Sequence, residues 1–86
     1  MWQNNNTDVM KRINRIKVVL AEKERTSKWL AEQLGKDCST VSKWCTNSSQ
    51  PSIETFLQIA KLLEVDVKDL LYSTLEEPVQ IVRLMK

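Results

Sequence analysis

Apolar residues repeat at helical spacing in two short runs in the middle of the chain, and a single glycine separates the runs. Gly35 can take the left-handed backbone of a tight turn at little cost, so the pattern predicts two short helices joined by a turn. Asp37 stands where its side chain can accept from a free backbone N–H at the start of the second helix. The apolar stripes are Leu30, Ala31 and Leu34 in residues 27–34, and Val41, Trp44 and Cys45 in residues 38–46. The rest of the second helix is small or cationic, which leaves that face for something outside the protein.

Longer apolar patterns precede and follow this pair of helices. Upstream, Thr7 or Asp8 can cap a helix that runs to about Glu24. Its expected core face consists of Val9, Ile13, Ile16, Val19 and Leu20. Downstream, Ser52 can cap a helix that Val65 ends, and this helix is apolar almost all round. Its apolar residues are Ile53, Phe56, Leu57, Ile59, Ala60, Leu62 and Leu63, so we expect a central core helix with one side at a subunit contact.

Polar residues mark the remaining boundaries between these helices. Thr26 can cap the helix over residues 27–34, and Asn47 can take a left-handed backbone after residue 46. Asp66 can cap a short fifth helix from Val67 to about Tyr72. Two residues of that helix are expected to close the core, Leu70 and Leu71.

The two ends of the chain differ in composition from the helical part, residues 8–72. Residues 1–7 are polar and rich in Asn, which is typical of a mobile tail. Residues 73–86 form an extension in which Val79, Ile81 and Val82 favour a strand. Helical spacing fits the extension nearly as well, through Val79, Val82 and Met85. A lone strand would need a partner, because it cannot satisfy its own backbone.

The helical part resembles the helix-turn-helix of the phage-repressor (Cro/xenobiotic-response-element) family, over residues 13–71. Ala31, Gly35 and Val41 have the mutual spacing that two closely packed helices around a sharp turn require. The matching residues are Arg15, Ile16, Lys17, Leu30, Ala31, Leu34, Gly35, Val41, Ser42, Lys43, Trp44, Pro51, Ser52, Leu57, Ile59, Ala60, Leu62 and Leu70. The resemblance implies an all-α, five-helix, lambda-repressor-like domain that places its helix 38–46 in the major groove of double-stranded DNA, usually as a homodimer.

The resemblance also implies which residues meet DNA. The positions that read base edges are Cys38, Ser39, Thr40 and Lys43. The positions that meet phosphates are Ser27, Lys28, Ser42, Thr46, Ser48 and Ser49. The best-known members of the family carry Gln at the start of this helix, and the small residues found here cannot make a bidentate contact with adenine. We therefore expect Lys43 to donate to guanine, and water-mediated or shape readout to contribute more.

Composition argues against an enzyme. The chain has 86 residues, enough for one domain but not for a roomy catalytic cleft as well. It has no histidine, which removes the commonest general base and metal ligand. Cys38 and Cys45 would lie roughly 10 Å apart on one helix, beyond the reach of a disulfide. With no nucleophile–base pair and no glycine-rich phosphate loop, we expect neither catalysis nor a cofactor.

Charge is distributed unevenly along the chain. Residues 1–50 hold nine basic and five acidic residues, whereas residues 51–86 hold four basic and six acidic residues. A basic half that contains the helix-turn-helix suits a polyanion bound on one side, although charge alone is equally typical of a solvated surface. No signal peptide or membrane-length apolar run is visible. We expect a cytoplasmic protein of the bacterial nucleoid or a phage-infected cell, with no membrane partner.

Three functions remain open from the sequence. The leading one is a sequence-specific transcriptional regulator, a repressor, that acts as a homodimer. The second is an antitoxin, which would use the same DNA-binding domain and hold a toxin through another surface, with residues 73–86 as the natural place. The third is a protein-interaction module without DNA binding, which the small residues at the start of helix 38–46 would suit.

Overall fold

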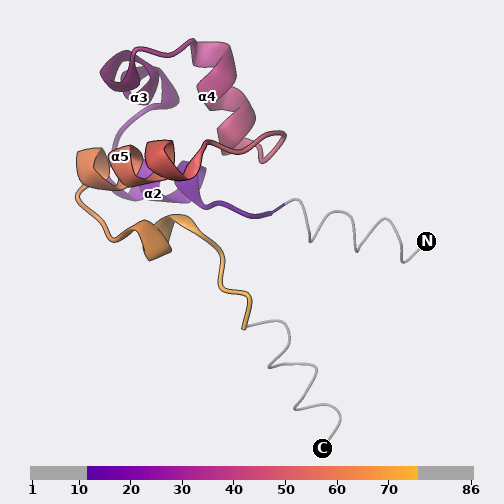
Figure 1. Ribbon diagram of the computed structural model, residues 1–86. Helices are drawn as coiled ribbons and strands as arrows, with labels where there is room; N and C mark the ends of the chain where they lie inside the picture. The colour runs from indigo at the N-terminus through magenta and orange to yellow at the C-terminus, as the bar shows by residue number, and fades with distance from the viewer. Residues whose placement is uncertain (1–11, 76–86) are drawn as a thin grey trace, which may run out of the picture.

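The computed structural model describes residues 12–75, and this part of the chain is helical without a β-sheet (Figure 1). Its α-helices are α2 (Ile16–Glu22), α3 (Ser27–Leu34), α4 (Cys38–Cys45) and α5 (Ile53–Leu63). A short 3-10 helix, η1 (Val67–Leu70), follows α5. The mostly helical prediction is confirmed for these residues. The count of five α-helices is not confirmed, because the last predicted helix is a 3-10 helix and ends before Tyr72.

The helix-turn-helix is formed by α3 and α4, which pack against one another across a tight turn (Figure 1). Gly35 ends α3 with a φ of 67°, the left-handed backbone that the sequence predicts there. Ala31 is 2% exposed, and its small side chain lets the two helices approach closely. Val41 is 0% exposed and anchors α4 in the core, where Trp44 of the same helix is also buried. The predicted arrangement of these two helices is confirmed.

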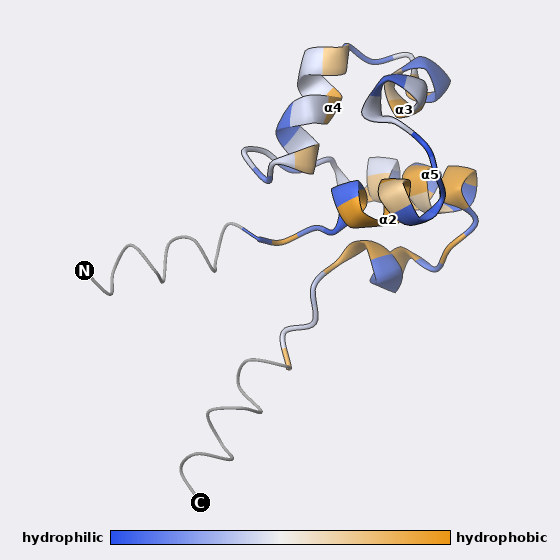
Figure 2. Ribbon diagram, turned by 180° about the vertical axis from the view of Figure 1, so that it is seen from behind, coloured by the Kyte–Doolittle hydropathy of each residue, from blue (hydrophilic) through white to orange (hydrophobic). Residues whose placement is uncertain are grey.

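The rest of the core comes from α2, α5 and η1. Figure 2 shows the strongly apolar ribbon concentrated in α5, in part of α2 and beside η1, whereas α4 is mostly pale or hydrophilic. Burial of one aliphatic side chain contributes about 1.5–3 kcal/mol, so these helices supply much of the stability. The buried side chains from this group are Ile16, Val19, Leu20, Phe56, Ile59, Ala60, Leu63 and Leu70.

The helix before the helix-turn-helix begins later than predicted, because α2 starts at Ile16. Asn14 explains the difference: its side-chain Oδ1 accepts from the backbone N of Ile16 at 3.0 Å, a local bond that competes with helix formation. The backbone of Asn14 also forms an isolated antiparallel bridge with Leu71. Ile13, predicted in the core, is therefore 46% exposed. The predicted start at residues 7–8, and Val9, lie outside the described residues.

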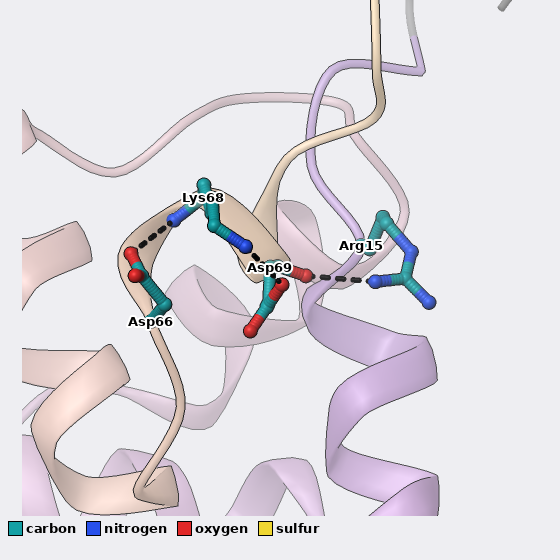
Figure 3. Close-up of polar contacts among 4 residues, drawn as sticks. All are labelled: Arg15, Asp66, Lys68 and Asp69. Carbon is teal, nitrogen blue, oxygen red and sulfur yellow. Dashed lines mark hydrogen bonds and ion pairs between the residues drawn. The ribbon is translucent and has the colours of Figure 1, made fainter.

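The segment after α5 returns to the start of α2. Arg15 donates from its backbone N to the Leu70 carbonyl at 2.7 Å. The Arg15 guanidinium also donates through Nη1 to the Asp69 carbonyl at 2.8 Å (Figure 3). Asp66 caps η1 as predicted, since its carboxylate accepts from the backbone N of Lys68 (Figure 3). The two bonds of Arg15 hold η1 against the start of α2.

Two details of this last segment differ from the prediction. Leu70 is 0% exposed and closes the core, but Leu71 is 39% exposed, because its extended backbone in the bridge turns it away from the core. Helix α5 ends at Leu63, because Glu64 takes a left-handed φ of 58° before Val65 is reached.

Of the four predicted N-caps that lie within residues 12–75, Thr26, Ser52 and Asp66 make the predicted side-chain bond. Thr26 Oγ1 accepts from the backbone N of Trp29 at 3.0 Å, and Ser52 Oγ accepts from that of Thr55 at 3.1 Å. Asp37 is the N-cap residue of α4 but makes no side-chain capping bond. Its carboxylate is exposed, and water competes there with the backbone N–H groups.

Two predicted terminal segments fall largely outside the described residues. The tail at residues 1–7 lies outside them, as does the strand or helix expected over residues 79–85. Of the extension at residues 73–86, the structure describes residues 73–75, which form neither helix nor strand.

Candidate nucleic-acid interface

The outward side of α4 gathers the residues that the sequence predicts to read bases. Cys38, Ser39 and Lys43 are exposed, and Thr40 is half-buried. Val41 and Trp44, on the opposite side of the same helix, are buried. Because the buried pair fixes the rotation of the helix about its axis, the small polar side chains are presented to solvent together. We call Cys38, Ser39, Thr40, Ser42 and Lys43 the α4 outer face.

Lys43 is the single cationic residue of α4. Among residues 12–75 it takes part in no ion pair, so its ammonium is available to an external acceptor. It also stands in the last turn of the helix, where a positive charge interacts favourably with the helix dipole. Lys43 is therefore a long and exposed donor beside small hydroxyl side chains. The small side chains allow the helix to approach a groove closely, and Lys43 can then reach into it.

The loop after α4 carries three of the predicted phosphate contacts, Thr46, Ser48 and Ser49, and all three are exposed. The Lys43 carbonyl accepts from the backbone N of Ser48 at 2.9 Å and from that of Ser49 at 3.3 Å. It also accepts from Thr46 Oγ1 at 3.2 Å, and this hydroxyl lies 2.8 Å from Ser48 Oγ. These backbone N–H groups are already bonded, and the Thr46 and Ser48 hydroxyls are bonded within the loop, so they must exchange these bonds to contact a phosphate. Among residues 12–75, the Ser49 hydroxyl makes no such bond.

The remaining predicted phosphate contacts lie on two other parts of the helix-turn-helix. Ser42 is exposed on α4, beside Lys43. Ser27 and Lys28 form the first turn of α3, where Lys28 is exposed and Ser27 is half-buried. Thr26 already satisfies one backbone N–H of that turn, so the charge of Lys28 is the stronger attraction for an anion there.

A group of three amide side chains connects the loop after α4 to the segment before α2. Asn14 is 2% exposed and lies among hydrogen-bond partners from both segments. Asn47 takes a left-handed φ of 61°, which is predicted, but its side-chain bonds to Asn14 are not predicted. Gln50 completes the group. The available signal is an Asn two residues before Ile16, because an Asn side chain readily accepts from the backbone N–H two positions on and so forms a local turn.

The two cysteines lie in different environments on α4. Both thiols are free, as predicted; Cys38 is exposed and Cys45 is half-buried. Burial raises the pKa of the Cys45 thiol above its ordinary value, and the nearby ammonium of Lys17 acts in the opposite direction. Among residues 12–75, no group of three or more His, Cys, Asp or Glu side chains is arranged to hold a metal ion.

A second exposed surface, of different chemistry, lies on α5. Ile53 is 74% exposed and Leu57 is 52% exposed, four residues apart on the same side of the helix. Exposed polar and charged residues stand beside them on this helix, namely Glu54, Gln58 and Lys61. We call Ile53, Glu54, Leu57, Gln58 and Lys61 the α5 outer face. Across residues 12–75, no helix is long and apolar enough to cross a membrane.

Comparison with known proteins identifies the helix pair. A family model described as a Cro/C1-type helix-turn-helix DNA-binding domain matches residues 15–74. A crystal structure of a presumed DNA-binding protein from Bacteroides fragilis is similar, with a TM-score of 0.69 and 57% sequence identity. That similarity covers 70% of this chain and 97% of the Bacteroides fragilis chain. Among curated protein sequences, none is significantly similar to the chain.

Proposed function

Because the chain belongs to the family of Cro/C1-type helix-turn-helix DNA-binding domains, we propose that it is a sequence-specific transcriptional repressor that reads the major groove with α4. The observation that carries this proposal is the division of α4 into two sides. Val41 and Trp44 anchor the helix in the core, and the α4 outer face is exposed apart from the half-buried Thr40. Such a protein acts where DNA is found, in the cytoplasm or the bacterial nucleoid, and it works without catalysis or a cofactor.

The length of each side chain on the α4 outer face decides which contact it makes with DNA. Lys43 donates to guanine O6 and N7, the contact that a long cation makes in the major groove. Cys38, Ser39 and Thr40 are too short for bidentate bonds to bases. Their small size lets the helix approach the base edges closely, and they act through bridging water or through DNA shape. Recognition by this face therefore depends on one direct donor and on the fit of a narrow, small-residue surface.

Contacts with the DNA backbone place the helix in register on the duplex. We assign them to Ser27 and Lys28 at the start of α3, to Ser42, and to the hydroxyls of the loop after α4, Thr46, Ser48 and Ser49. Phosphate contacts of this kind supply affinity and orientation, whereas base contacts supply the sequence preference.

The exposed apolar pair on α5 supports a homodimer. Single helix-turn-helix domains cover few base pairs, and dimers place two recognition helices about 34 Å apart along the duplex. Pairing of two α5 outer faces about a two-fold axis would bury Ile53 and Leu57, and it brings Glu54 of one copy toward Lys61 of the other. The segment over residues 79–85 is the alternative dimer surface that its apolar sequence suggests.

A chain ending at Ser73 separates these two surfaces. If sedimentation shows that the shortened chain dimerises like the parent, the assembly belongs to the α5 outer face. If the shortened chain is a monomer that still folds, the segment after Ser73 holds the dimer together.

The antitoxin function remains the second candidate, because the α5 outer face could instead be covered by a different protein. A toxin gene beside this one, and a heterodimer on co-expression, would favour it. The direct test of the leading function is selection of bound sites from a random DNA pool. We expect a two-fold symmetric sequence to be enriched, and failure to retard any DNA at low salt would leave the interaction-module function instead.

A further inference from the structure

The loop between α4 and α5 has few apolar anchors of its own. Thr46, Ser48 and Ser49 are exposed, and only Pro51 at its end is buried. Loops of this composition are ordinarily mobile, because few buried contacts offset their conformational entropy. The proposed function nevertheless requires their hydroxyls to meet phosphates in register with the α4 outer face. Something other than apolar packing must hold the loop.

Asn47 makes the bonds that hold it. Its Oδ1 accepts from the backbone N of Ile13 and from that of Asn14, each at 2.9 Å. The same oxygen accepts from Gln50 Nε2 at 3.1 Å. Asn47 Nδ2 donates to the Asn14 carbonyl at 3.1 Å. One side chain in the loop is therefore bonded to two consecutive residues that stand more than thirty positions earlier in the chain.

Asn14 makes the reciprocal set of bonds from the other segment. Its Nδ2 donates to the Trp44 carbonyl at 2.9 Å and to Gln50 Oε1 at 2.7 Å. Its Oδ1 accepts from the backbone N of Ile16. Both donor hydrogens and the acceptor are thus used, as a buried amide requires. We call Asn14, Asn47 and Gln50 the amide clasp.

The segment to which the loop is bonded is itself fixed to the domain. The Ile13 carbonyl accepts from the backbone N of Tyr72 at 3.1 Å, and Arg15 donates to the Leu70 carbonyl. Leu70 is 0% exposed in the core. The amide clasp therefore connects the loop after α4 to a rigid part of the molecule.

We propose that Asn47, supported by Asn14 and Gln50, is a positioning residue for DNA binding, which rests on the proposed function. The Lys43 carbonyl is bonded to Ser48 and Ser49, and the Trp44 carbonyl is bonded to Asn14, so the end of α4 and the loop move as one unit. The amide clasp fixes this unit before DNA arrives. Preorganisation of this kind raises affinity because less conformational entropy is lost on binding.

The backbone of Asn47 and its side chain do different things, and this makes the proposal testable. The backbone of Asn47 has a left-handed φ of 61°, and glycine adopts this conformation without strain. The Asn47→Gly variant therefore keeps the turn and removes the clasp bonds of this side chain, without a change of charge. Its control is Glu64→Gly compared with Glu64→Gln, since both remove the same charge and only the first places glycine at another left-handed position, the C-cap of α5, away from the loop.

The experiment measures affinity for the selected DNA over a range of salt, well below the unfolding temperature of each variant. We expect Asn47→Gly to bind about tenfold or more weakly than the parent. We expect the slope of log affinity against log salt to stay near the parental value, because the hydroxyls of the loop are uncharged and release no counterion from DNA. A purely structural role would lower the unfolding temperature and leave the DNA affinity of the folded protein unchanged.

Equal affinity for Asn47→Gly and the parent would overturn the proposal. If Asn47→Gly does not fold, Gln50→Ala takes its place, because it removes one bond to each of the other clasp members and lies in a half-buried position. The Glu64→Gly control should bind DNA as tightly as Glu64→Gln. A parent chain that binds no DNA would refute the proposed function instead, so the two failures are distinguishable.

Discussion

The outer faces of α4 and α5 are both exposed, but they have opposite chemistry. On α4 the exposed residues are small and polar, with one long cation, Lys43. On α5 the most exposed side chains are apolar, Ile53 at 74% and Leu57 at 52%. Each helix buries its opposite side in the same core, so burial alone does not distinguish them. The difference lies in what each helix offers to a partner.

This difference indicates that the two faces serve two kinds of partner. Small hydroxyls and an uncommitted ammonium match phosphates and base edges, which present acceptors in a groove. Exposed isoleucine and leucine side chains gain nothing from such a partner, and they are stabilised by contact with other apolar side chains. We therefore expect changes to the α4 outer face to alter DNA binding directly, and changes to the α5 outer face to alter assembly.

The largest expected effect is that of salt concentration on the DNA affinity of the α4 outer face. If the lysines and arginines of residues 1–50 neutralise about three or more phosphates per subunit, affinity of the dimer should fall roughly 1,000-fold between 50 and 200 mM salt. Dimerisation through an apolar α5 outer face should change little over the same range. Titrations followed by fluorescence anisotropy measure the first quantity and sedimentation the second. An affinity that does not respond to salt would contradict phosphate anchoring.

A carboxylate on the α5 outer face should produce the next largest effect. Leu57→Glu places like charges near the two-fold axis, and loss of the dimer should weaken binding to a two-half-site DNA by about 100-fold or more. Binding to a single half-site should remain close to that of the parent. The matched control is Gln33→Glu, which adds the same charge at an exposed position of α3, outside the α5 outer face and the proposed DNA contacts. A dimer that persists in Leu57→Glu would exclude this face.

Removal of the single long donor on the α4 outer face should produce the smallest of the three effects. Lys43→Ala should cost about 1–3 kcal/mol on the selected site and relax the preference at one base pair per half-site. Lys36→Ala removes an exposed lysine from the preceding turn and serves as the matched control. An equal loss on random DNA would place Lys43 on the phosphate backbone, and its base-reading role would be abandoned.

The helix-turn-helix could be predicted from the sequence because its determinants are local. The spacing of Ala31, Gly35 and Val41 encodes a close approach and a sharp turn within ten positions, and Gly35 has the left-handed backbone that this requires. Thr26 and Ser52 cap their helices through residues three positions away. Short-range patterns of this kind depend little on the rest of the fold.

The start of α2 and the amide clasp could not be predicted in the same way. The clasp joins Asn14 to Asn47 across 33 positions, and no periodicity links two amide side chains at that distance. The helical pattern through Ile13 predicts burial, whereas the bridge between Asn14 and Leu71 draws this segment out of the helix and leaves Ile13 exposed. The predicted burial of Leu71 is wrong for the same reason. Tertiary hydrogen bonds decided these positions against local propensity.

The candidate DNA contacts could be predicted only in part from the sequence. Their exposure on one side of α4 follows from the buried stripe of Val41 and Trp44, which the sequence reveals. Their individual roles rest on the resemblance to a family, and Lys43 apart, these residues are too small to indicate a particular base. The positioning of the loop around Ser48 by Asn47 became visible only with the structure.

The most direct test of the two-face account is a nuclear magnetic resonance titration of the isotopically labelled protein with its selected DNA. The measurement follows the backbone amide shift of every residue as the duplex is added to the preformed dimer. The account predicts the largest shifts over residues 38–43 and 46–49 and at Ser27 and Lys28, with the amides of Ile53 and Leu57 nearly unmoved. Large shifts at Ile53 and Leu57, with the α4 outer face unmoved, would contradict it.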